Sequence, residues 1–261
     1  MKSDSMGGII VTGSARGIGL AIAQTLSEVG YGLVIADIDE NAGGKAVTGI
    51  EATGGNAIFF KVDVADRPSV AAAVAACEKT YGHIHAIVNN AGFNRPQHFL
   101  ETTEENWERI LKVNGLGVLI GMQEAAKAMI ARGHRGKIVN TASIAGRGGD
   151  AEWVPYCASK AAVISMTQAG AKALAKYGIN VNAFGPGVVE TELWTQLDKD
   201  LMAMGISSKP GEAMQNFSKN IPLGRTSTPK DVVGTVAFLV SPASDYMTGQ
   251  CLMIDGGMIM Q

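Results

Sequence analysis

The sequence predicts an α/β fold in which a parallel sheet of seven strands carries helices on both faces. Short apolar runs rich in β-formers alternate along the chain with longer segments of helical periodicity, and this alternation is typical of consecutive βαβ units. A length of 261 residues, 46% of them hydrophobic, can bury the core of such a sheet. No linker, repeat or low-complexity segment interrupts the pattern, so we expect one domain.

Each expected strand is a short apolar run that ends near glycine or polar residues. The strands are expected within residues 7–13, 31–37, 56–64, 83–92, 136–143, 179–187 and 251–257. The helices are expected within residues 18–30, 41–54, 69–82, 106–132, 153–177 and 229–240. Residues 188–220 follow a strand and have no regular pattern, so we expect an insertion that forms helices over a site, as a substrate lid does.

Charge and composition exclude several classes of partner. The formal net charge is -2, from 22 Lys and Arg against 24 Asp and Glu, with no basic run, which disfavours nucleic acid and anionic membranes. No apolar segment approaches the roughly 18 residues of a membrane span. Cys77, Cys157 and Cys251 are too widely spaced to suggest a disulfide framework or a zinc site. We expect a cytoplasmic protein with a small-molecule ligand.

The run "VPYCASKAAV" places a tyrosine and a lysine four residues apart in a predicted helix. Tyr156 and Lys160 therefore share one face of that helix. Taken alone, such a pair is more often a packed tyrosine beside a lysine that reaches solvent. A catalytic interpretation needs support from other segments of the chain.

The run "TGSARGIG" joins the first predicted strand to the first helix. Glycines at positions 13, 17 and 19 allow a tight turn and a close approach of the backbone to a ligand. The helix that follows offers free N–H groups to a pyrophosphate. The spacing departs from G-x-G-x-x-G, and a purely structural turn remains an alternative.

The second predicted strand ends at Asp37. An acid there accepts hydrogen bonds from adenosine ribose hydroxyls and repels an added 2′-phosphate, which favours NAD over NADP. Arg16 is the competing signal, because it could reach a 2′-phosphate from the glycine turn. A helix cap at a solvated strand end is the structural alternative for Asp37.

Six motifs occur in order along the chain: "TGSARGIG", "NNAG" at residues 89–92, Asn114, Ser143, "YCASK" and "NAFGPG" at residues 182–187. Together they resemble the short-chain dehydrogenase/reductase family over nearly the whole chain. The resemblance implies a Rossmann-type doubly wound fold and a nicotinamide cofactor. Phe184 and Gly185 depart from the residues usual in the last motif, which affects local packing rather than the chemistry.

The resemblance also implies roles for individual residues. The catalytic set is Asn114, Ser143, Tyr156 and Lys160. The cofactor contacts are Gly13, Ser14, Arg16, Gly17, Ile18, Gly19, Asp37, Asn90, Gly92, Tyr156, Lys160, Pro186, Val189 and Thr191, with Asp63 and Val64 at the adenine. Asn114 bends its helix and holds a water that links Lys160 to solvent.

These residue types suit proton and hydride transfer without a metal ion. A tyrosine has an ordinary pKa of about 10, and a neighbouring ammonium favours its phenolate. Lys160 can also bind the nicotinamide ribose, while Ser143 can hydrogen-bond the substrate oxygen.

The C-terminal third resembles the polyol (sorbitol and galactitol) and acetoin/2,3-butanediol dehydrogenase branch. We therefore expect NAD-dependent, reversible oxidation of a secondary alcohol on a polyol. The candidate substrate residues are Ser143, Ala145, Asn94, Glu152 and Trp194. Asn94 and Glu152 offer partners for several hydroxyls, although Glu152 is equally consistent with a solvated loop and Trp194 with core packing.

Two other functions stay open: an acetoin or diacetyl reductase, and a protein of the same fold that senses the cofactor without turnover. We also expect a homotetramer assembled through the helices over residues 106–132 and 153–177, because both carry small and apolar residues on more than one face. The apolar tail at 258–260 could reach a neighbouring subunit, with packing on its own chain as the alternative. The resemblance to some members of the family implies that Gln261 could approach a magnesium ion.

Overall fold

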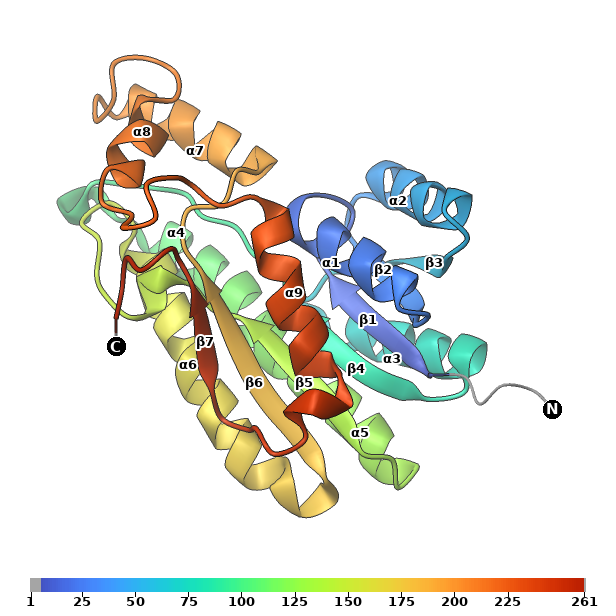
Figure 1. Cartoon of the computed structure of the whole chain (residues 1–261). Coiled ribbons are helices and arrows are strands. Elements are labelled where there is room, and N and C mark those ends of the chain that lie inside the picture. The colour runs from blue at the N-terminus through green and yellow to red at the C-terminus, as the bar shows by residue number, and fades with distance from the viewer. Residues whose placement is uncertain (1–5, 261) are drawn as a thin grey trace.

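The computed structural model describes residues 6–260 and contains a parallel seven-stranded sheet (Figure 1). The strands are β1 (Gly8–Thr12), β2 (Gly32–Asp37), β3 (Asn56–Lys61), β4 (Ile84–Asn89), β5 (Gly136–Thr141), β6 (Ile179–Pro186) and β7 (Cys251–Ile254). Their order across the sheet is β3-β2-β1-β4-β5-β6-β7. The predicted fold class and its seven strands are confirmed. Gln261, named above as a possible metal neighbour, lies outside the described residues.

Helices connect the strands and begin where the sequence supplies start signals. They are α1 (Gly17–Glu28), α2 (Glu40–Ala52), α3 (Arg67–Tyr81), α4 (Glu104–Leu111), α5 (Gly117–Ala131), α6 (Val154–Leu174), α7 (Glu192–Ala203), α8 (Glu212–Ser218) and α9 (Pro229–Val240). Side chains of Asp39, Asp66 and Thr103 accept backbone N–H groups at the starts of α2, α3 and α4. Within residues 6–260, no helix has the length and apolar character needed to span a membrane.

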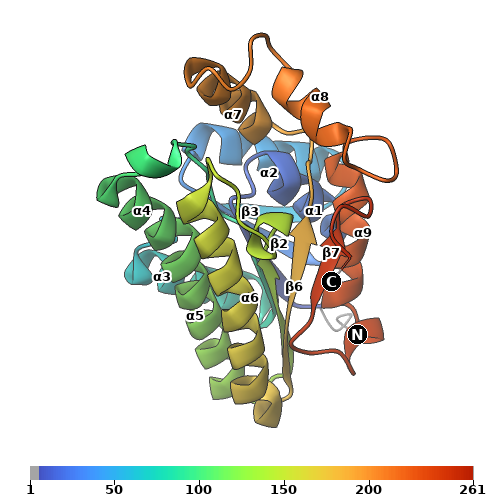
Figure 2. The same ribbon diagram turned by 90° about the vertical axis from the view of Figure 1, so that its left-hand side faces the viewer.

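Helices cover both faces of the sheet (Figure 2), and an apolar core lies on each face. On one face α3, α5 and α6 pack against residues such as Ile87 and Ile138, which are fully buried. On the other face α1, α2 and α9 cover Ile9 and Val11. Because both faces are covered, the central strands read as continuous apolar runs. A ligand can then reach the sheet only at the ends of its strands.

The helix predicted over residues 106–132 is two helices. It begins at Glu104 and is interrupted by a π-helical turn, Lys112–Leu116, between α4 and α5. The buried Asn114 lies in this turn, where its Nδ2 donates to the Phe93 carbonyl (2.8 Å) and its Oδ1 accepts from the Phe93 N–H (3.0 Å). The turn aims this amide at the loop after β4, a use of π-turns common at functional sites.

The strand order places a crevice at the carboxyl edge of the sheet. The chain runs outward from β1 through β2 to β3, then returns to β4 on the other side of β1. Loops that leave β1 and β4 therefore diverge, and such a reversal is where doubly wound sheets bind ligands. Helices α7 and α8, formed by the predicted insertion, stand above this edge (Figure 1).

Candidate active site

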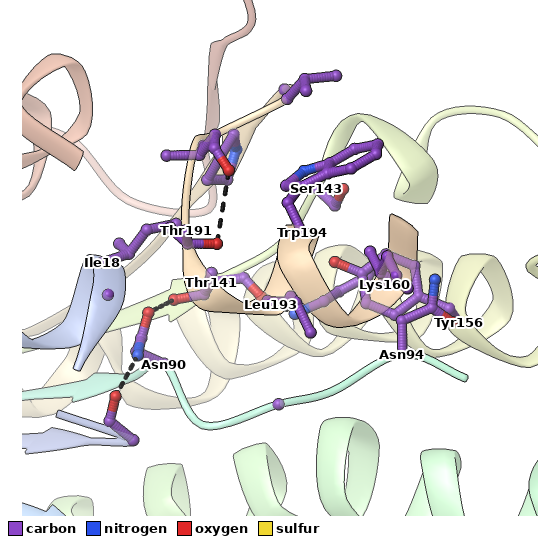
Figure 3. Close-up of a pocket in the computed structure, with 18 of the residues that line it drawn as sticks. Ile18, Asn90, Asn94, Thr141, Ser143, Tyr156, Lys160, Thr191, Leu193 and Trp194 are labelled. Carbon is purple, nitrogen blue, oxygen red and sulfur yellow. Dashed lines mark hydrogen bonds between the residues drawn. The ribbon is translucent and has the colours of Figure 1, made fainter. Parts of the chain in front are cut away.

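A cavity of about 400 Å³ opens at the carboxyl ends of β1, β4, β5 and β6. Most of the residues proposed from the sequence line it: Gly13, Arg16, Gly17, Ile18, Gly19, Asn90, Gly92, Asn94, Ser143, Tyr156, Lys160, Pro186, Val189, Thr191 and Trp194. Figure 3 shows Ile18 and Asn90 at one end of the cavity and Tyr156, Lys160 and Asn94 at the other. The fold thus joins the glycine turn to the Tyr–Lys pair in one elongated site.

The glycine turn depends on glycine at two close approaches. Gly13 has a φ of 63°, and a Cβ there would lie 2.7 Å from the Ala91 Cα. A Cβ on Gly19 would lie 2.2 Å from the Gly13 carbonyl oxygen. Asn90 braces the turn by donating from Nδ2 to the carbonyls of Thr12 (3.1 Å) and Gly13 (3.0 Å). The start of α1 is thereby left open to the cavity, as an anion-binding turn requires.

Ser14 and Asp37 support the turn from outside the cavity. The buried Ser14 hydroxyl donates to the Val11 carbonyl (2.6 Å) and accepts from the Ala36 N–H (3.2 Å), which ties β1 to β2. The Asp37 carboxylate accepts from the Ala15 N–H (3.0 Å) and, with its other oxygen, from the Asp39 N–H (3.1 Å). Asp37 is therefore held at the end of β2 beside the turn.

Asp63 and Val64 also lie outside the cavity wall. They follow β3, which pairs with β2, so they stand near the same edge of the sheet as Asp37. The exposed Asp63 carboxylate accepts from the Ala65 N–H (2.9 Å). Their predicted contact with an adenine stays a prediction.

At the opposite end, α6 presents Tyr156 to the hydroxyl of Ser143, which follows β5. Burial raises the pKa of Tyr156 to about 12, and its hydrogen bond with Ser143 acts in the lowering direction. A phenol with this pKa is protonated at neutral pH, so a nearby positive charge is needed to make it a base.

Lys160 supplies a cation beside this tyrosine. Its Nζ lies 5.6 Å from the centroid of the Tyr156 ring and donates to the Thr141 carbonyl (2.8 Å). The side chain is 4% exposed, and burial lowers its pKa to about 8. Because no carboxylate pairs with this ammonium in the contacts of residues 6–260, its charge can act on the cavity.

Asn114 does not line the cavity but holds two elements that do. Besides its two bonds to Phe93, its Nδ2 lies 3.3 Å from the Oγ of Ser159, next to Lys160 on α6. It thus fixes the loop carrying Gly92 and Asn94 against the helix carrying the Tyr–Lys pair. The predicted link to solvent through a water stays a prediction.

Aromatic rings form the wall beyond Tyr156. Trp153 stacks on Phe217 with centroids 5.3 Å apart, and Trp194 meets both rings edge-on at 6.0 and 5.5 Å. Trp153 also meets the Tyr156 ring edge-on at 6.4 Å. Met258 packs on this cluster within its own chain. The C-terminal tail therefore contributes to the surroundings of its own cavity.

Two side chains of this wall have unsatisfied polar atoms. Asn94 is 6% exposed and Trp153 is 8% exposed. Neither polar atom of the Asn94 amide has a hydrogen-bond partner among residues 6–260, and the same holds for Trp153 Nε1. A buried polar group without a partner costs about 1–3 kcal/mol, so a ligand with hydroxyl groups, which both donate and accept, would stabilise both side chains.

Ala145 and Glu152 are not part of the cavity wall formed by residues 6–260. Ala145 packs behind the wall in the aromatic cluster. The Glu152 pKa is raised, first by burial and then by the neighbouring Asp150 carboxyl. Their expected contacts with a substrate therefore stay predictions.

The sequence interpretation missed several residues of the wall: Thr141, Ala142, Leu193, Leu197 and Phe217. Leu193 and Leu197 stand four residues apart on α7, a spacing that places them on one helix face. This spacing could have identified the two leucines from the sequence. Nothing in the sequence indicated that Phe217 on α8 would stack on a ring 64 residues earlier.

The chain matches the protein family described as enoyl-(acyl carrier protein) reductase over residues 13–259. It is 44% identical to galactitol 2-dehydrogenase from Agrobacterium fabrum, over 95% of each chain. It is 40% identical to L-2,3-butanediol dehydrogenase from Corynebacterium glutamicum, over 96% of this chain and 97% of that one.

Among solved structures, the chain is similar to a variant of actinorhodin polyketide ketoreductase with NADPH. The TM-score is 0.92 and the sequence identity 32%, over 99% of both chains. This similarity covers the sheet and the edge at which the cavity opens.

Proposed function

This chain belongs to the short-chain dehydrogenase/reductase family, and from that membership we propose that it oxidises a secondary alcohol of a polyol to the ketone, reversibly and with NAD. Oxidoreduction of alcohols with a nicotinamide cofactor is the activity common to its relatives. The observation that carries the proposal is the joint placement of Ser143, Tyr156 and Lys160 at one end of a cavity whose other end is the glycine turn.

Each side chain has a distinct part in the reaction. A nicotinamide bound in this cavity would supply the acceptor for the hydride of the carbinol carbon. Tyr156 takes the proton of the substrate hydroxyl, and Ser143 hydrogen-bonds the same oxygen as its charge changes. Lys160 favours the phenolate of Tyr156 because the cation is buried beside it.

The residues at the turn fit a dinucleotide. Gly13 and Gly19 keep the backbone free of side chains where the cavity meets α1, so phosphate groups can approach the helix N-terminus. Asp37 supports NAD as the preferred cofactor, because its carboxylate is fixed beside the turn by two backbone N–H groups. The similar ketoreductase structure contains NADPH, so the fold alone does not decide between the two.

Unsatisfied polar groups support a polyol as substrate. The Asn94 amide offers an NH₂ group with two N–H donors and an acceptor oxygen, and Trp153 Nε1 offers a further donor. A substrate with several hydroxyls satisfies more of these groups than a simple alcohol does. The competing substrate is acetoin or 2,3-butanediol, favoured by the apolar rings of Trp153, Trp194 and Phe217.

A substrate panel tests this proposal. Galactitol, sorbitol, 2,3-butanediol and a hydroxysteroid are supplied with NAD or NADP, and NADH or NADPH is followed by absorbance. We expect the largest kcat/KM for a six-carbon polyol with NAD. A higher value for 2,3-butanediol would select the reductase alternative, and nucleotide binding without turnover would select the cofactor-sensing one.

Asn94→Leu is expected to lower kcat/KM for the preferred polyol by about 10- to 100-fold, since the amide no longer pairs with a hydroxyl. The same variant should turn over 2-butanol, which has no second hydroxyl, within about threefold of wild type. The two kcat/KM values, measured on one preparation, separate recognition from damage to the site. Equal losses for both alcohols would remove Asn94 from substrate recognition.

Exposed apolar side chains support a homotetramer. Trp107, Leu116 and Tyr177 are 42%, 43% and 43% exposed, and all lie on the helical segments expected to form the interfaces. We expect light scattering at micromolar concentration to give the mass of four chains. A monomer mass under these conditions contradicts the assembly.

The free cysteines, Cys77, Cys157 and Cys251, support a reducing cytoplasm as the location of the protein.

A further inference from the structure

The guanidinium of Arg16 at the glycine turn is already occupied by acids. Arg16 lines the cavity, and its side chain is 49% exposed. One nitrogen, Nη2, pairs with Asp39, and the other, Nη1, lies 3.4 Å from Oε2 of Glu192 on α7. The basic group that could recruit a 2′-phosphate is therefore engaged on two sides.

Asp39 is held in place independently of this ion pair. It is the N-cap of α2, where its Oδ1 accepts from the Ala42 N–H at 3.0 Å, while Oδ2 receives Arg16. Its pKa lies below the usual range, first because of the Ala42 N–H and then because of the Arg16 cation. The helix start thus keeps an anion directed at Arg16.

Asp37 and Asp39, at the end of β2, bind different parts of the glycine turn. Asp37 accepts from the backbone of the turn, at Ala15, and from the backbone of Asp39. Asp39 binds the side chain that the turn projects, at Arg16. Glu192 is the weaker contact, because its side chain is 70% exposed and its distance is longer.

We propose that Asp39 is a second residue that sets the cofactor preference, because it neutralises Arg16 and keeps this arginine from binding the 2′-phosphate of NADP. The inference rests on the proposed nicotinamide site and deepens its preference for NAD. A 2′-phosphate entering beside Asp37 gains nothing from Arg16 unless the arginine leaves Asp39. It also meets the negative charge of Asp39 itself.

Asp39→Asn is the sharpest variant, since asparagine is also a good N-cap and preserves the start of α2. The probes are 2′,5′-ADP and 5′-AMP, measured by isothermal titration calorimetry on the full chain, so the readout needs no turnover. We expect Asp39→Asn to bind 2′,5′-ADP about tenfold more tightly and 5′-AMP within about twofold of wild type.

Glu40→Gln is the matched control. It removes the same charge one residue away, from a side chain paired with Lys61 at 2.7 Å rather than with Arg16. We expect its 2′,5′-ADP affinity to change by less than about twofold. Thermal melts of both variants should match wild type, which verifies that α2 is intact.

A double-mutant cycle separates release of Arg16 from loss of repulsion. In an Arg16→Gln background, the gain from Asp39→Asn should fall from about tenfold to about twofold, because no arginine remains to be released. If the gain in 2′,5′-ADP affinity is undiminished in that background, the proposal is overturned, and Asp39 acts only by repelling the 2′-phosphate. A gain no larger than that of Glu40→Gln overturns it altogether.

The same titrations judge the proposed function separately. If the wild-type protein binds 2′,5′-ADP more tightly than 5′-AMP, the proposed preference for NAD is wrong. The part assigned to Asp39 is still decided by the difference between Asp39→Asn and Glu40→Gln.

Discussion

Replacing Tyr156 with phenylalanine is expected to lower kcat by about 10³-fold while NADH affinity stays within about twofold of wild type. Only the hydroxyl that is proposed to take the substrate proton is removed, and loss of a general base typically costs 10²- to 10⁴-fold. The ring keeps its edge contact with Trp153 and its place beside Lys160. The separation of kcat from binding is what distinguishes a catalytic hydroxyl from a packing tyrosine.

Stopped-flow or steady-state absorbance of NADH gives kcat, and fluorescence titration gives the affinity. Tyr246→Phe is the control, because this fully exposed tyrosine loses the same hydroxyl away from the cavity. A Tyr156→Phe enzyme that keeps more than about a tenth of the wild-type kcat would falsify the assignment of Tyr156 as the base.

Lys160→Met is expected to weaken cofactor affinity and to lower kcat by about 10²- to 10³-fold, since one ammonium is proposed to act on both Tyr156 and the nicotinamide ribose. The same change should stabilise the protein. Burial lowers the pKa of Lys160 from 10.5 to about 8, which at neutral pH corresponds to about 3 kcal/mol of destabilisation. Loss of the hydrogen bond to Thr141 offsets about 1 kcal/mol of this, so we expect a net gain of about 2 kcal/mol.

The pH dependence of that gain has a definite sign. Below pH 8 Lys160 is charged in both folded and unfolded states, and the cost of burying it is fully present. Between pH 8 and 10.5 the folded state is neutral while the unfolded state still binds the proton, so wild-type stability rises with pH relative to the variant. The advantage of Lys160→Met should therefore shrink across this interval.

Urea unfolding of both proteins at pH 7 and pH 10, without added nucleotide, measures the effect. Lys137→Met is the matched control, because Lys137 is a buried lysine that pairs with Asp245 at 2.6 Å and also contacts Asn180 and Ser244. Its removal ends hydrogen bonds to Asn180, the buried Ser244 and the exposed Asp245, and should destabilise the protein. A Lys160→Met protein less stable than wild type at pH 7 would show that Lys160 is a structural residue.

Local patterns were sufficient for the architecture. Strand and helix positions follow from the alternation of short apolar runs with helical periodicity, because each face of the sheet must be covered. The turn at Gly13 to Gly19 and the pair Tyr156 and Lys160 were also predictable, since their geometry depends on residues within one turn or one helix.

The features that the sequence did not define depend on contacts between distant parts of the chain. Asn94 was expected at the substrate, but the lack of partners for its amide among residues 6–260 depends on how the loop after β4 meets the wall of the cavity. Among residues 6–260, Trp153 lines that cavity and Glu152, its neighbour in sequence, does not.

The sequence by itself determined the fold class, the glycine turn and the pairing of Tyr156 with Lys160, because periodicity and short spacing specify local geometry. Tertiary structure alone decided which charges meet. Arg16 lies 23 residues from Asp39 and 176 from Glu192 in sequence, and folding brings all three together at one edge of the sheet. A sequence pattern indicates which charged groups lie near a site. The electrostatic interaction between them depends on the distances that separate them, which only the packing of the chain defines.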